Sequence, residues 1–328
     1  MERRNDAWHD MLSALQNANS ILLCTHISPD GDAIGSTLAM GRGLRKLGKQ
    51  VTMACGDPVP ELFLFLPGAK DMVTPEQLRD RQFDAALALD AADLARVGEC
   101  GEAFLSAPVT AQIDHHPDNP CYARYNVVDG KAAAAGCLVY KALLGLGLTV
   151  DQEMAMCLYC AISTDTGNFR FRNTDGEAFA IMAELMKTGF QLPEAARPLH
   201  QLREEANVRL LGRAIDSLRI FGGGKCAAMA LRPQDFRAAN AKPEHNTGIV
   251  NYALDIPGVE IAYLAEQREN GQVKASLRSL PPWSVGEIAR KYGGGGHDQA
   301  AGMQYPGSLD EMCAALDGEM LQMLGEKP

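Results

Sequence analysis

Apolar runs alternate with amphipathic stretches along the first half of the chain. Four runs rich in Leu, Ile, Val and Ala have the length and composition of buried strands, and they cover residues 21–25, 51–55, 85–90 and 109–114. Apolar residues also recur at helical spacing, which predicts helices over about 34–47, 132–147 and 151–164. Strands that alternate with helices are typical of an α/β domain in which helices flank a largely parallel sheet.

The pattern changes after a run of glycines at 222–224. Before it, residues 176–220 predict helices, with a break at Gly189 and Pro193. After it, strands are expected at 225–231, 259–267 and 272–280, and helices near 283–291 and 309–324. This second pattern predicts a smaller α+β domain of about a hundred residues.

A chain of 328 residues is longer than one average domain. We predict an α/β domain over 1–190, a helical linker over 191–220 and an α+β domain over 221–328. A substrate cleft is expected between the two domains.

Composition and charge narrow the class of protein. The hydrophobic fraction of 46% and the charged fraction of 22% are ordinary for a globular protein, so they argue against disorder or a coiled coil. The net charge of -10 argues against a protein that holds long nucleic acid on a broad basic face. A nucleic-acid substrate would therefore be short or gripped locally, and metal ions could supply the missing positive charge.

The sequence also predicts a cytoplasmic protein without a membrane segment. No run of 18 or more apolar residues occurs, and the first twenty residues mix charges and amides where a signal peptide needs an apolar core. The nine cysteines are odd in number and scattered, which favours a reducing compartment. Cys157 and Cys160 form one C-x-x-C in a helical stretch, where small core residues are favoured over a redox or metal role.

Polar residues with catalytic potential follow the predicted strands. In a parallel sheet the carboxyl ends of the strands converge on one crevice, where ligands bind. The residues placed at this edge are His26, Asp30, Asp32, Asp90, Asp114, His115 and His116, and Asp165 near the end of the helix over 151–164 joins them.

Each of these residues has an ordinary structural alternative. Asp30 and Asp32 could form a turn and a helix N-cap, Asp90 could be a loop residue, and the two histidines could lie on the surface. All these alternatives would have to hold at one edge of one sheet, which favours a shared function. Crowded carboxylates repel one another unless cations are bound, and mixed carboxylate and imidazole ligands suit manganese, with enough donors for two ions. Two such ions can clamp a phosphate and activate water.

A second candidate site lies in the stretch RKYGGGGHDQAAG. Four glycines before His297 allow the backbone to approach a ligand closely, although a flexible turn is the simpler interpretation. We expect a short helix to begin at Gln299, with N-terminal amides that favour an anion. The stretch lacks the Lys-Ser/Thr ending of a P-loop and the spacing of a dinucleotide fingerprint. Arg278, in the strand over 272–280, could point into the same cleft.

Five motifs, THISPDGDAIGS, LALDAAD, IDHH, STDTGNF and GGGGHDQAAG, occur in this order between residues 25 and 302. Together they resemble the DHH superfamily of phosphoesterases, whose members carry a DHH-associated C-terminal domain. The chain length, without an added sensor or transmembrane segment, is most similar to the nano-RNase (oligoribonuclease) and pAp-phosphatase branch.

The resemblance implies a role for each motif residue. One manganese ion would be held by His26, Asp30 and Asp90, and a second by Asp32, Asp90, His115 and Asp165, with Co²⁺ or Mg²⁺ as substitutes. Asp114 would orient an imidazole, and His116 would lie near the scissile phosphate to stabilise charge or protonate the leaving oxygen. The terminal phosphate and base of the nucleotide would be bound by Arg278, Gly294, Gly295, Gly296 and His297.

The resemblance therefore implies a manganese-dependent phosphodiesterase and phosphatase. It would cut nanoRNA of two to five nucleotides to mononucleotides and convert 3′-phosphoadenosine 5′-phosphate (pAp) to AMP by a two-metal mechanism. Alternatives are a phosphodiesterase for cyclic or linear dinucleotides such as c-di-AMP or pApA, an inorganic pyrophosphatase, and a non-catalytic nucleotide-binding module. The expected partners are short RNA or DNA and nucleotides, and a homodimer is compatible with the sequence. The roles of Arg170 and Arg172 stay open.

Overall fold

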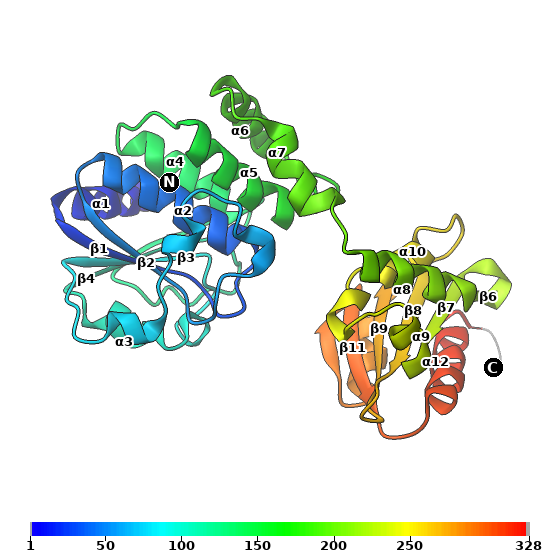
Figure 1. Cartoon of the computed structure of the whole chain (residues 1–328). Helices are drawn as coiled ribbons and strands as arrows, with labels where there is room; N and C mark the ends of the chain where they lie inside the picture. Colours follow the sequence, from blue (N-terminus) through cyan, green and yellow to red (C-terminus); the bar gives the residue numbers. More distant parts are fainter. Residues whose placement is uncertain (1, 326–328) are drawn as a thin grey trace. The chain divides into compact units, whose positions relative to one another are not determined.

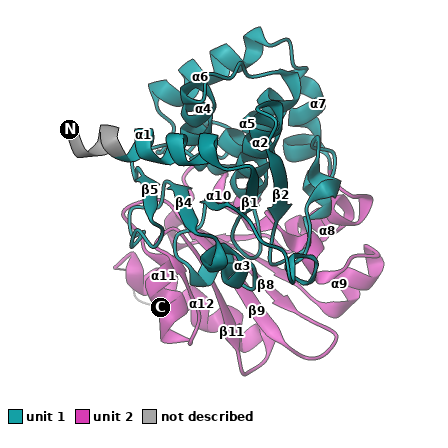
Figure 2. Cartoon of the chain, turned by 90° about the vertical axis from the view of Figure 1, so that its left-hand side faces the viewer, with its two compact units in different colours: residues 1–202 teal, residues 203–328 magenta. Residues whose placement is uncertain are grey.

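The computed structural model describes residues 2–325, and the chain divides into two compact units, residues 1–202 and 203–328 (Figure 2). The division between Leu202 and Arg203 falls inside the segment 191–220 for which a linker is predicted. Each unit has its own sheet and its own hydrophobic core. The two units are described separately below.

The first unit contains a five-stranded, fully parallel sheet with the order β2-β1-β3-β4-β5. The strands are β1 (Ser20–Cys24), β2 (Gln50–Ala54), β3 (Ala85–Leu89), β4 (Val109–Asp114) and β5 (Tyr125–Val128). The first four confirm the strands predicted from the apolar runs. The sequence pattern did not predict β5, a short edge strand in which only Val127 is buried.

Helices cover both faces of this sheet, which confirms the predicted α/β class (Figure 1). The α-helices are α1 (Glu2–Asn17), α2 (Gly31–Lys46), α3 (Cys100–Ser106), α4 (Ala135–Gly145), α5 (Gln152–Asp165), α6 (Gly176–Lys187) and α7 (Leu192–Ala196). Short 3-10 turns cover 61–63, 69–71, 75–78 and 95–97, and a π-helical turn covers 197–201. Strand β3 is buried along its whole length because alternate residues face the two layers: Leu87 belongs to the hydrophobic cluster that includes α2 and α5, and Ala88 belongs to the cluster that includes α3.

Helices α2 and α5 pack so closely that no side chain fits at Gly35. A Cβ atom added at Gly35 would lie 2.3 Å from the carbonyl oxygen of Cys157 and 2.9 Å from the backbone nitrogen of Ala161, so only glycine fits. Cys157 and Cys160 are buried in α5 as free thiols within this core, as the structural interpretation of the C-x-x-C predicts. This contact fixes the end of α5 beside the start of α2.

The second unit contains a six-stranded mixed sheet with the order β10-β11-β9-β8-β7-β6. The strands are β6 (Arg219–Phe221), β7 (Cys226–Leu231), β8 (Ile261–Gln267), β9 (Val273–Ser279), β10 (Gly295–His297) and β11 (Ala300–Tyr305), and only β7 and β8 run parallel. Helices α8 (Glu205–Asp216), α9 (Pro233–Ala238) and α10 (Ile249–Leu254) pack on one face. Helices α11 (Val285–Lys291) and α12 (Leu309–Met323) pack on the other. Two further 3-10 turns cover 222–224 and 243–246.

The prediction of a short helix that begins at Gln299 is wrong. Instead β10 and β11 form a hairpin whose two turn residues are Asp298 and Gln299, and β11 pairs with β9 over six residues. The alternation of buried Ala301 and Met303 with exposed Gly302 is the period of a half-buried strand. Pairing with β9 overrides the helical propensity of the two alanines.

Among the described helices, none combines the length and the apolar character that a membrane span requires.

The α2–α5 contact gives a test of the fold. Gly35→Ala should lower the free energy of unfolding by about 1–3 kcal/mol, because the added methyl group must displace backbone atoms of α5. Gly176→Ala is the matched control, since an added Cβ at the first residue of α6 has no atom within 4 Å, and it should change stability by less than about 0.5 kcal/mol. Urea unfolding followed by circular dichroism measures both, and equal stabilities would contradict the packing described.

Candidate functional site

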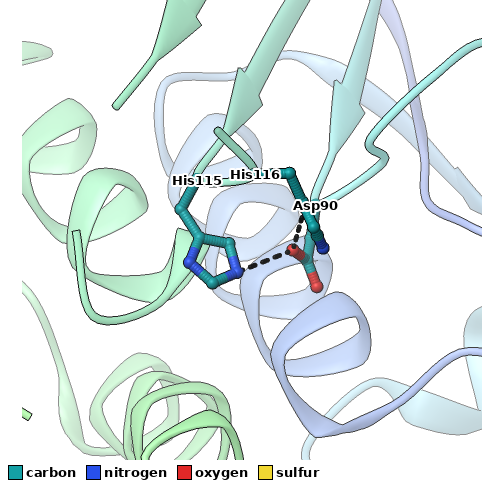
Figure 3. A group of neighbouring side chains, drawn as sticks. All are labelled: Asp90, His115 and His116. Carbon is teal, nitrogen blue, oxygen red and sulfur yellow. Dashed lines mark ion pairs between the residues drawn. The ribbon is translucent and has the colours of Figure 1, made fainter. Parts of the chain in front are cut away.

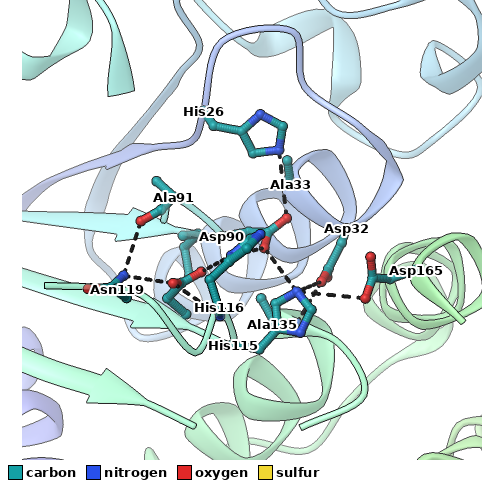
Figure 4. Close-up of polar contacts among 12 residues, drawn as sticks. His26, Asp32, Ala33, Asp90, Ala91, His115, His116, Asn119, Ala135 and Asp165 are labelled. Atoms are coloured by element: carbon teal, nitrogen blue, oxygen red, sulfur yellow. Dashed lines mark hydrogen bonds and ion pairs between the residues drawn. The ribbon is translucent and has the colours of Figure 1, made fainter. Parts of the chain in front are cut away.

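The polar residues predicted from the strand ends come together at the carboxyl edge of the first sheet (Figure 4). His26 and Asp30 follow β1, and Asp30 is the N-cap of α2, its carboxylate accepting hydrogen bonds from the backbone nitrogens of Asp32 and Ala33. Asp90 follows β3, Asp114 is the last residue of β4, and His115 and His116 come next. Asp165 is the last residue of α5. The topology of a parallel sheet brings these groups from distant parts of the sequence to one place.

Asp90 lies at the centre of the cluster. One oxygen, Oδ1, is 3.5 Å from Nε2 of His115 and 3.8 Å from Nδ1 of His116 (Figure 3), and the other, Oδ2, is 3.8 Å from Nε2 of His26. Asp90 is 2% exposed, and its Oδ1 has no hydrogen-bond partner among the described residues. Its backbone has a φ of 55°, a left-handed conformation that strains a residue other than glycine. Buried atoms without partners and strained backbone are characteristic of functional sites.

Three overlapping groups of side chains could each surround a metal ion. Within each group, the ligand atoms all lie within 4.8 Å of one another. The groups are His26, Asp30 and Asp90; Asp32, His115 and Asp165; and Asp90, His115 and His116. Asp90 belongs to two of these groups, because its Oδ2 faces His26 and its Oδ1 faces His115. The geometry is thus compatible with two neighbouring ions, while the assignment of residues to each ion stays a prediction.

His26 and His115 present the same ring nitrogen, Nε2, to the carboxylates. Nδ1 of His26 lies 2.8 Å from the carbonyl oxygen of Ile27, and Nδ1 of His115 lies 3.2 Å from the carbonyl oxygen of Ala132. A proton on Nδ1 that is donated to these carbonyls leaves the lone pair on Nε2, which faces the carboxylates in both residues. This is the tautomer with which a histidine binds a metal through Nε2.

Asp32 is held by the beginning of α4. Its carboxylate accepts hydrogen bonds from the backbone nitrogens of Ala135 at 2.6 Å and Gly136 at 2.8 Å, and from the hydroxyl of Ser36 at 3.0 Å. Burial raises the pKa of Asp32 to about 7, and the neighbouring charge of Asp165 acts in the same direction. Burial also raises the pKa of Asp90 well above its usual value, and the surrounding aspartates add to this effect.

Asp114 and His116 form a hydrogen-bonded pair. Nδ1 of His116 donates to Oδ1 of Asp114 at 2.8 Å, and Nδ2 of Asn119 donates to Oδ2 at 2.7 Å. Burial favours the protonated form of Asp114, but these hydrogen bonds outweigh it and lower the pKa of Asp114. The same hydrogen bond raises the pKa of His116. His116, with 40% of its side chain exposed, therefore has its Nδ1 fixed and its Nε2 available to a ligand.

Two supporting residues were not predicted from the sequence. Asn119 orients Asp114, and Nδ2 of Asn173 contacts the carbonyl oxygen of Ala133 at 2.9 Å and the carboxylate of Asp165 at 3.3 Å. Each asparagine lies within eight residues of the motif residue that it supports. This proximity is the only feature of the sequence that could have identified them. Arg170 and Arg172, whose orientation was left open, are both exposed, and Nε of Arg170 donates to the carbonyl oxygen of Gly167.

A third residue, Arg96, was also missed. Its guanidinium Nη2 lies 3.1 Å from Nδ1 of His26, and its carbonyl oxygen accepts a hydrogen bond from the backbone nitrogen of Ile27. Arg96 is six residues beyond Asp90, in the loop that follows the same strand. That position at a strand's carboxyl end is the signal that could have found it.

The predicted nucleotide-binding residues lie in the second unit, at one end of its sheet. Arg278 of β9 is opposite Ala300 of β11, which is opposite His297 of β10. Residues in one register row point to the same face, so Arg278 and His297 share a face with only an alanine between them. Burial lowers the pKa of Arg278. A hollow of about 620 Å³ opens over this sheet, and its lining includes Ser276 and Gly302 of the next row.

The glycines beside His297 have a packing role. A Cβ atom at Gly296 would lie 2.4 Å from the carbonyl oxygen of Ala300, and one at Gly294 would lie 2.3 Å from the carbonyl oxygen of Gly302. Neither position tolerates a side chain, whereas Gly295 has open space at this point. The glycine run therefore lets β10 lie tightly on β11, and its contact with a nucleotide stays a prediction.

The donor set of the first unit fits divalent metal ions. Four carboxylates and two imidazoles converge, the imidazoles present Nε2, and the buried Oδ1 of Asp90 has no hydrogen-bond donor among the described residues. Such oxygen and nitrogen donors suit first-row transition metals and magnesium. A cation would satisfy the orphaned oxygen and offset the repulsion between the carboxylates.

Comparisons with known proteins match both units. The model of the DHH family, N-terminal domain, matches residues 20–162, and that of the DHHA1 domain matches residues 223–322. The bifunctional oligoribonuclease and PAP phosphatase NrnA of Thermus thermophilus is 36% identical over 294 residues, which cover 89% of this chain and 86% of that protein. The protein of the same name from Bacillus subtilis is 25% identical over 300 residues, covering 89% of this chain and 91% of the relative.

Solved structures share the fold. An exopolyphosphatase-related protein from Bacteroides fragilis superimposes with a TM-score of 0.87 at 24% identity, covering 98% of this chain and 97% of that one. RecJ of Thermus thermophilus, crystallised in complex with Mn²⁺, gives a TM-score of 0.54 at 17% identity and covers 97% of this chain but 55% of its own.

The buried carboxylates predict how the metal-free protein responds to pH. Because the pKa of Asp32 is raised to about 7, the folded state keeps a proton that the unfolded chain releases near its usual value. This contribution to stability is complete at low pH and is lost as the pH rises through the folded-state pKa. We expect the melting temperature in EDTA to fall between about pH 4 and pH 7, and Asp90→Asn to raise it at the upper end because one buried charge is removed.

Thermal unfolding of the metal-free protein in EDTA, and separately of the protein in EDTA-free buffer with manganese, measures this effect. Glu102→Gln, which removes an exposed carboxylate from α3, is the control and should leave the pH dependence unchanged. Added manganese should stabilise the wild-type protein more at high pH than at low pH, because the ligands bind metal in their deprotonated form. A melting temperature that rises with pH in EDTA would show that the carboxylates are not crowded as described.

Proposed function

We propose that this chain, which belongs to the DHH family, trims RNA of about two to five nucleotides to mononucleotides and removes the 3′-phosphate of pAp. Members of the DHH family hydrolyse phosphoester bonds, and both proposed reactions are of this type. The relatives named for these two activities align with almost 90% of the chain, through both units. The observation that carries the proposal is the position of Asp90, whose two oxygens face two separate sets of ligands.

The proposed site holds two divalent ions, with manganese favoured by the mixed donors. His26, Asp30 and Asp90 would hold one, and Asp32, Asp90, His115 and Asp165 would hold the other, so Asp90 would contribute to both. Such ions neutralise phosphate oxygens and activate the attacking water. The carbonyl oxygens of Ile27 and Ala132 accept from Nδ1 of the two histidines, which would leave Nε2 of each free to bind an ion.

His116 is proposed to act on the leaving group. Its Nδ1 donates to Asp114, which fixes the ring and favours the charged form, so that a proton on Nε2 can pass to the departing oxygen. Asn119 prevents Asp114 from rotating by holding its second oxygen. Asp114 thus positions and charges the ring, and His116 contacts the substrate.

The second unit is proposed to hold the rest of the nucleotide. Arg278 offers a planar, permanently charged group that suits a terminal phosphate, and His297 lies on the same face beyond Ala300. The adjoining hollow of about 620 Å³ has a volume in the range of small-ligand sites. Binding by one arginine and a short hairpin is consistent with short substrates and with the net charge of -10.

A substrate panel tests the proposed reaction. Manganese-loaded protein should consume pAp and RNA of two to five nucleotides, and its rate should fall sharply toward twenty nucleotides, with products identified by chromatography. Asp90→Ala should lower kcat by about 10³-fold or more, because both ligand sets lose the carboxylate that they share. Glu102→Gln serves again as the control variant. A folded Asp90→Ala protein with near-wild-type turnover would exclude the shared-ligand assignment.

The same panel includes c-di-AMP, linear pApA and inorganic pyrophosphate. A preference for either dinucleotide would replace the proposal by a dinucleotide phosphodiesterase, and a preference for pyrophosphate would replace it by a pyrophosphatase. Tight nucleotide binding without turnover or metal binding would identify a binding module.

Arg278→Ala tests the assigned role of the second unit. We expect KM for pAp to rise by about tenfold or more while kcat changes less, because a charged hydrogen bond to a phosphate remote from the reaction is lost. Arg237→Ala, which removes an exposed arginine of α9 that pairs with Glu269, is the matched control. Steady-state kinetics measures both variants, and a drop confined to kcat would place Arg278 outside substrate binding.

A further inference from the structure

Arg96 brings a cation to the rim of the acidic cluster. It lies in the 3-10 turn Ala95–Val97, its side chain is exposed, and its Nη2 is 3.1 Å from Nδ1 of His26. The ion pairs of Asp30 and Asp90 are formed with histidines, and Arg96 forms none among the described residues. A guanidinium close to a buried acidic site, yet not paired with it, is available to another anion.

The backbone of Arg96 is fixed to the loop that carries His26. Its carbonyl oxygen accepts from the backbone nitrogen of Ile27 at 2.8 Å, and its backbone nitrogen donates to Oδ1 of Asp93 at 2.9 Å. The side chain therefore starts from a defined point beside His26 although it is exposed. Such preorganisation reduces the entropy lost when the side chain binds a ligand.

The contact between Arg96 and His26 cannot persist when His26 binds a metal. Nδ1 of His26 lies 2.8 Å from the carbonyl oxygen of Ile27 and 3.1 Å from Nη2 of Arg96, and one nitrogen cannot donate to the first and accept from the second. If Nε2 is a metal ligand, the proton must be on Nδ1, and it is donated to Ile27. The guanidinium then faces an N–H group and has lost its acceptor.

The charge balance of the metal-loaded site also favours a positively charged side chain beside His26. Four ionised carboxylates balance the charge of two divalent ions, so a phosphate needs further positive groups to complement it. His116 lies 3.8 Å from Oδ1 of Asp90, while His26, with Arg96 beside it, lies 3.8 Å from Oδ2. His116 and His26 thus face the two oxygens of Asp90, and Arg96 contacts the other ring nitrogen, Nδ1, of His26.

We propose that Arg96 binds the phosphate group undergoing hydrolysis, on the His26 side of the site, and that its guanidinium becomes available when His26 binds metal. This inference rests on the proposed function. A guanidinium presents several N–H donors in one plane, which suits two oxygens of a phosphate and the charge that develops on them during transfer. Arg96 and His116 then hold the phosphate from opposite sides, with His116 nearer the leaving oxygen.

Equilibrium binding to the manganese-loaded protein tests the proposal without turnover. Isothermal titration with inorganic phosphate should show about tenfold or weaker affinity for Arg96→Ala than for the wild type, and an intermediate value for Arg96→Lys. In EDTA the wild type and Arg96→Ala should bind phosphate with equal affinity, because the guanidinium is proposed to become available only when His26 binds metal, and a weaker affinity of Arg96→Ala in EDTA would contradict that coupling. Arg79→Ala is the control, because this exposed arginine precedes β3 and therefore lies toward the opposite edge of the sheet.

A titration with manganese separates this role from a purely structural one. Arg96→Ala should bind manganese within about threefold of the wild type, and its kcat for pAp should fall by about 10²–10³-fold, as for loss of one oxyanion donor. Manganese affinity that falls tenfold or more would show that Arg96 acts by orienting His26, and unchanged phosphate affinity would equally overturn the proposal. If the wild type hydrolyses no nucleotide, the proposed function fails, while the phosphate titration still decides whether Arg96 binds the anion.

Discussion

The structure of the first unit depends on how it tolerates four carboxylates at one edge of a buried sheet. Asp32 and Asp90 are almost fully buried, and burial together with mutual repulsion makes their ionised forms costly. Backbone amides at helix N-termini lower this cost by donating hydrogen bonds to the carboxylates. The first amides of α2 bind Asp30 and those of α4 bind Asp32. One oxygen of Asp90 receives no such donor among the described residues, and a cation is the group that can satisfy it.

The packing of α2 on α5 converts this electrostatic arrangement into a rigid one. Because Gly35 lets the two helices approach to backbone contact, the last residue of α5 is fixed relative to the first turn of α2. Asp165 and Asp32, which are 133 residues apart in the sequence, consequently face His115 at 3.6 and 3.7 Å. A site that must keep like charges together needs such a scaffold, since flexible loops would relax and separate them.

Sequence reasoning could predict the first unit because its chemistry follows short apolar runs. His26, Asp90 and Asp114 each stand where a buried strand ends, so the parallel-sheet rule alone brings them together. Arg96 was missed because its place beside His26 depends on a backbone hydrogen bond between two loops, which no periodicity encodes. The stretch from Gln299 was mistaken for a helix because alanines favour helices locally, and only the pairing of β11 with β9 decides otherwise. Asn119 and Asn173 were missed because amides that orient a ligand resemble ordinary loop residues.

An acidic protein can select an anionic substrate when its carboxylates serve to concentrate cations. In the proposed function, phosphate affinity would reside in the metal ions and in a few placed groups, His116 and Arg96 of the first unit and Arg278 of the second, and the general surface would contribute little. Long nucleic acid gains nothing from such a surface because it finds no continuous basic track to replace its counterions. A substrate of a few nucleotides can engage these discrete groups without extending over the acidic remainder. The acidic charge distribution is therefore one physical reason for the short substrates that we propose.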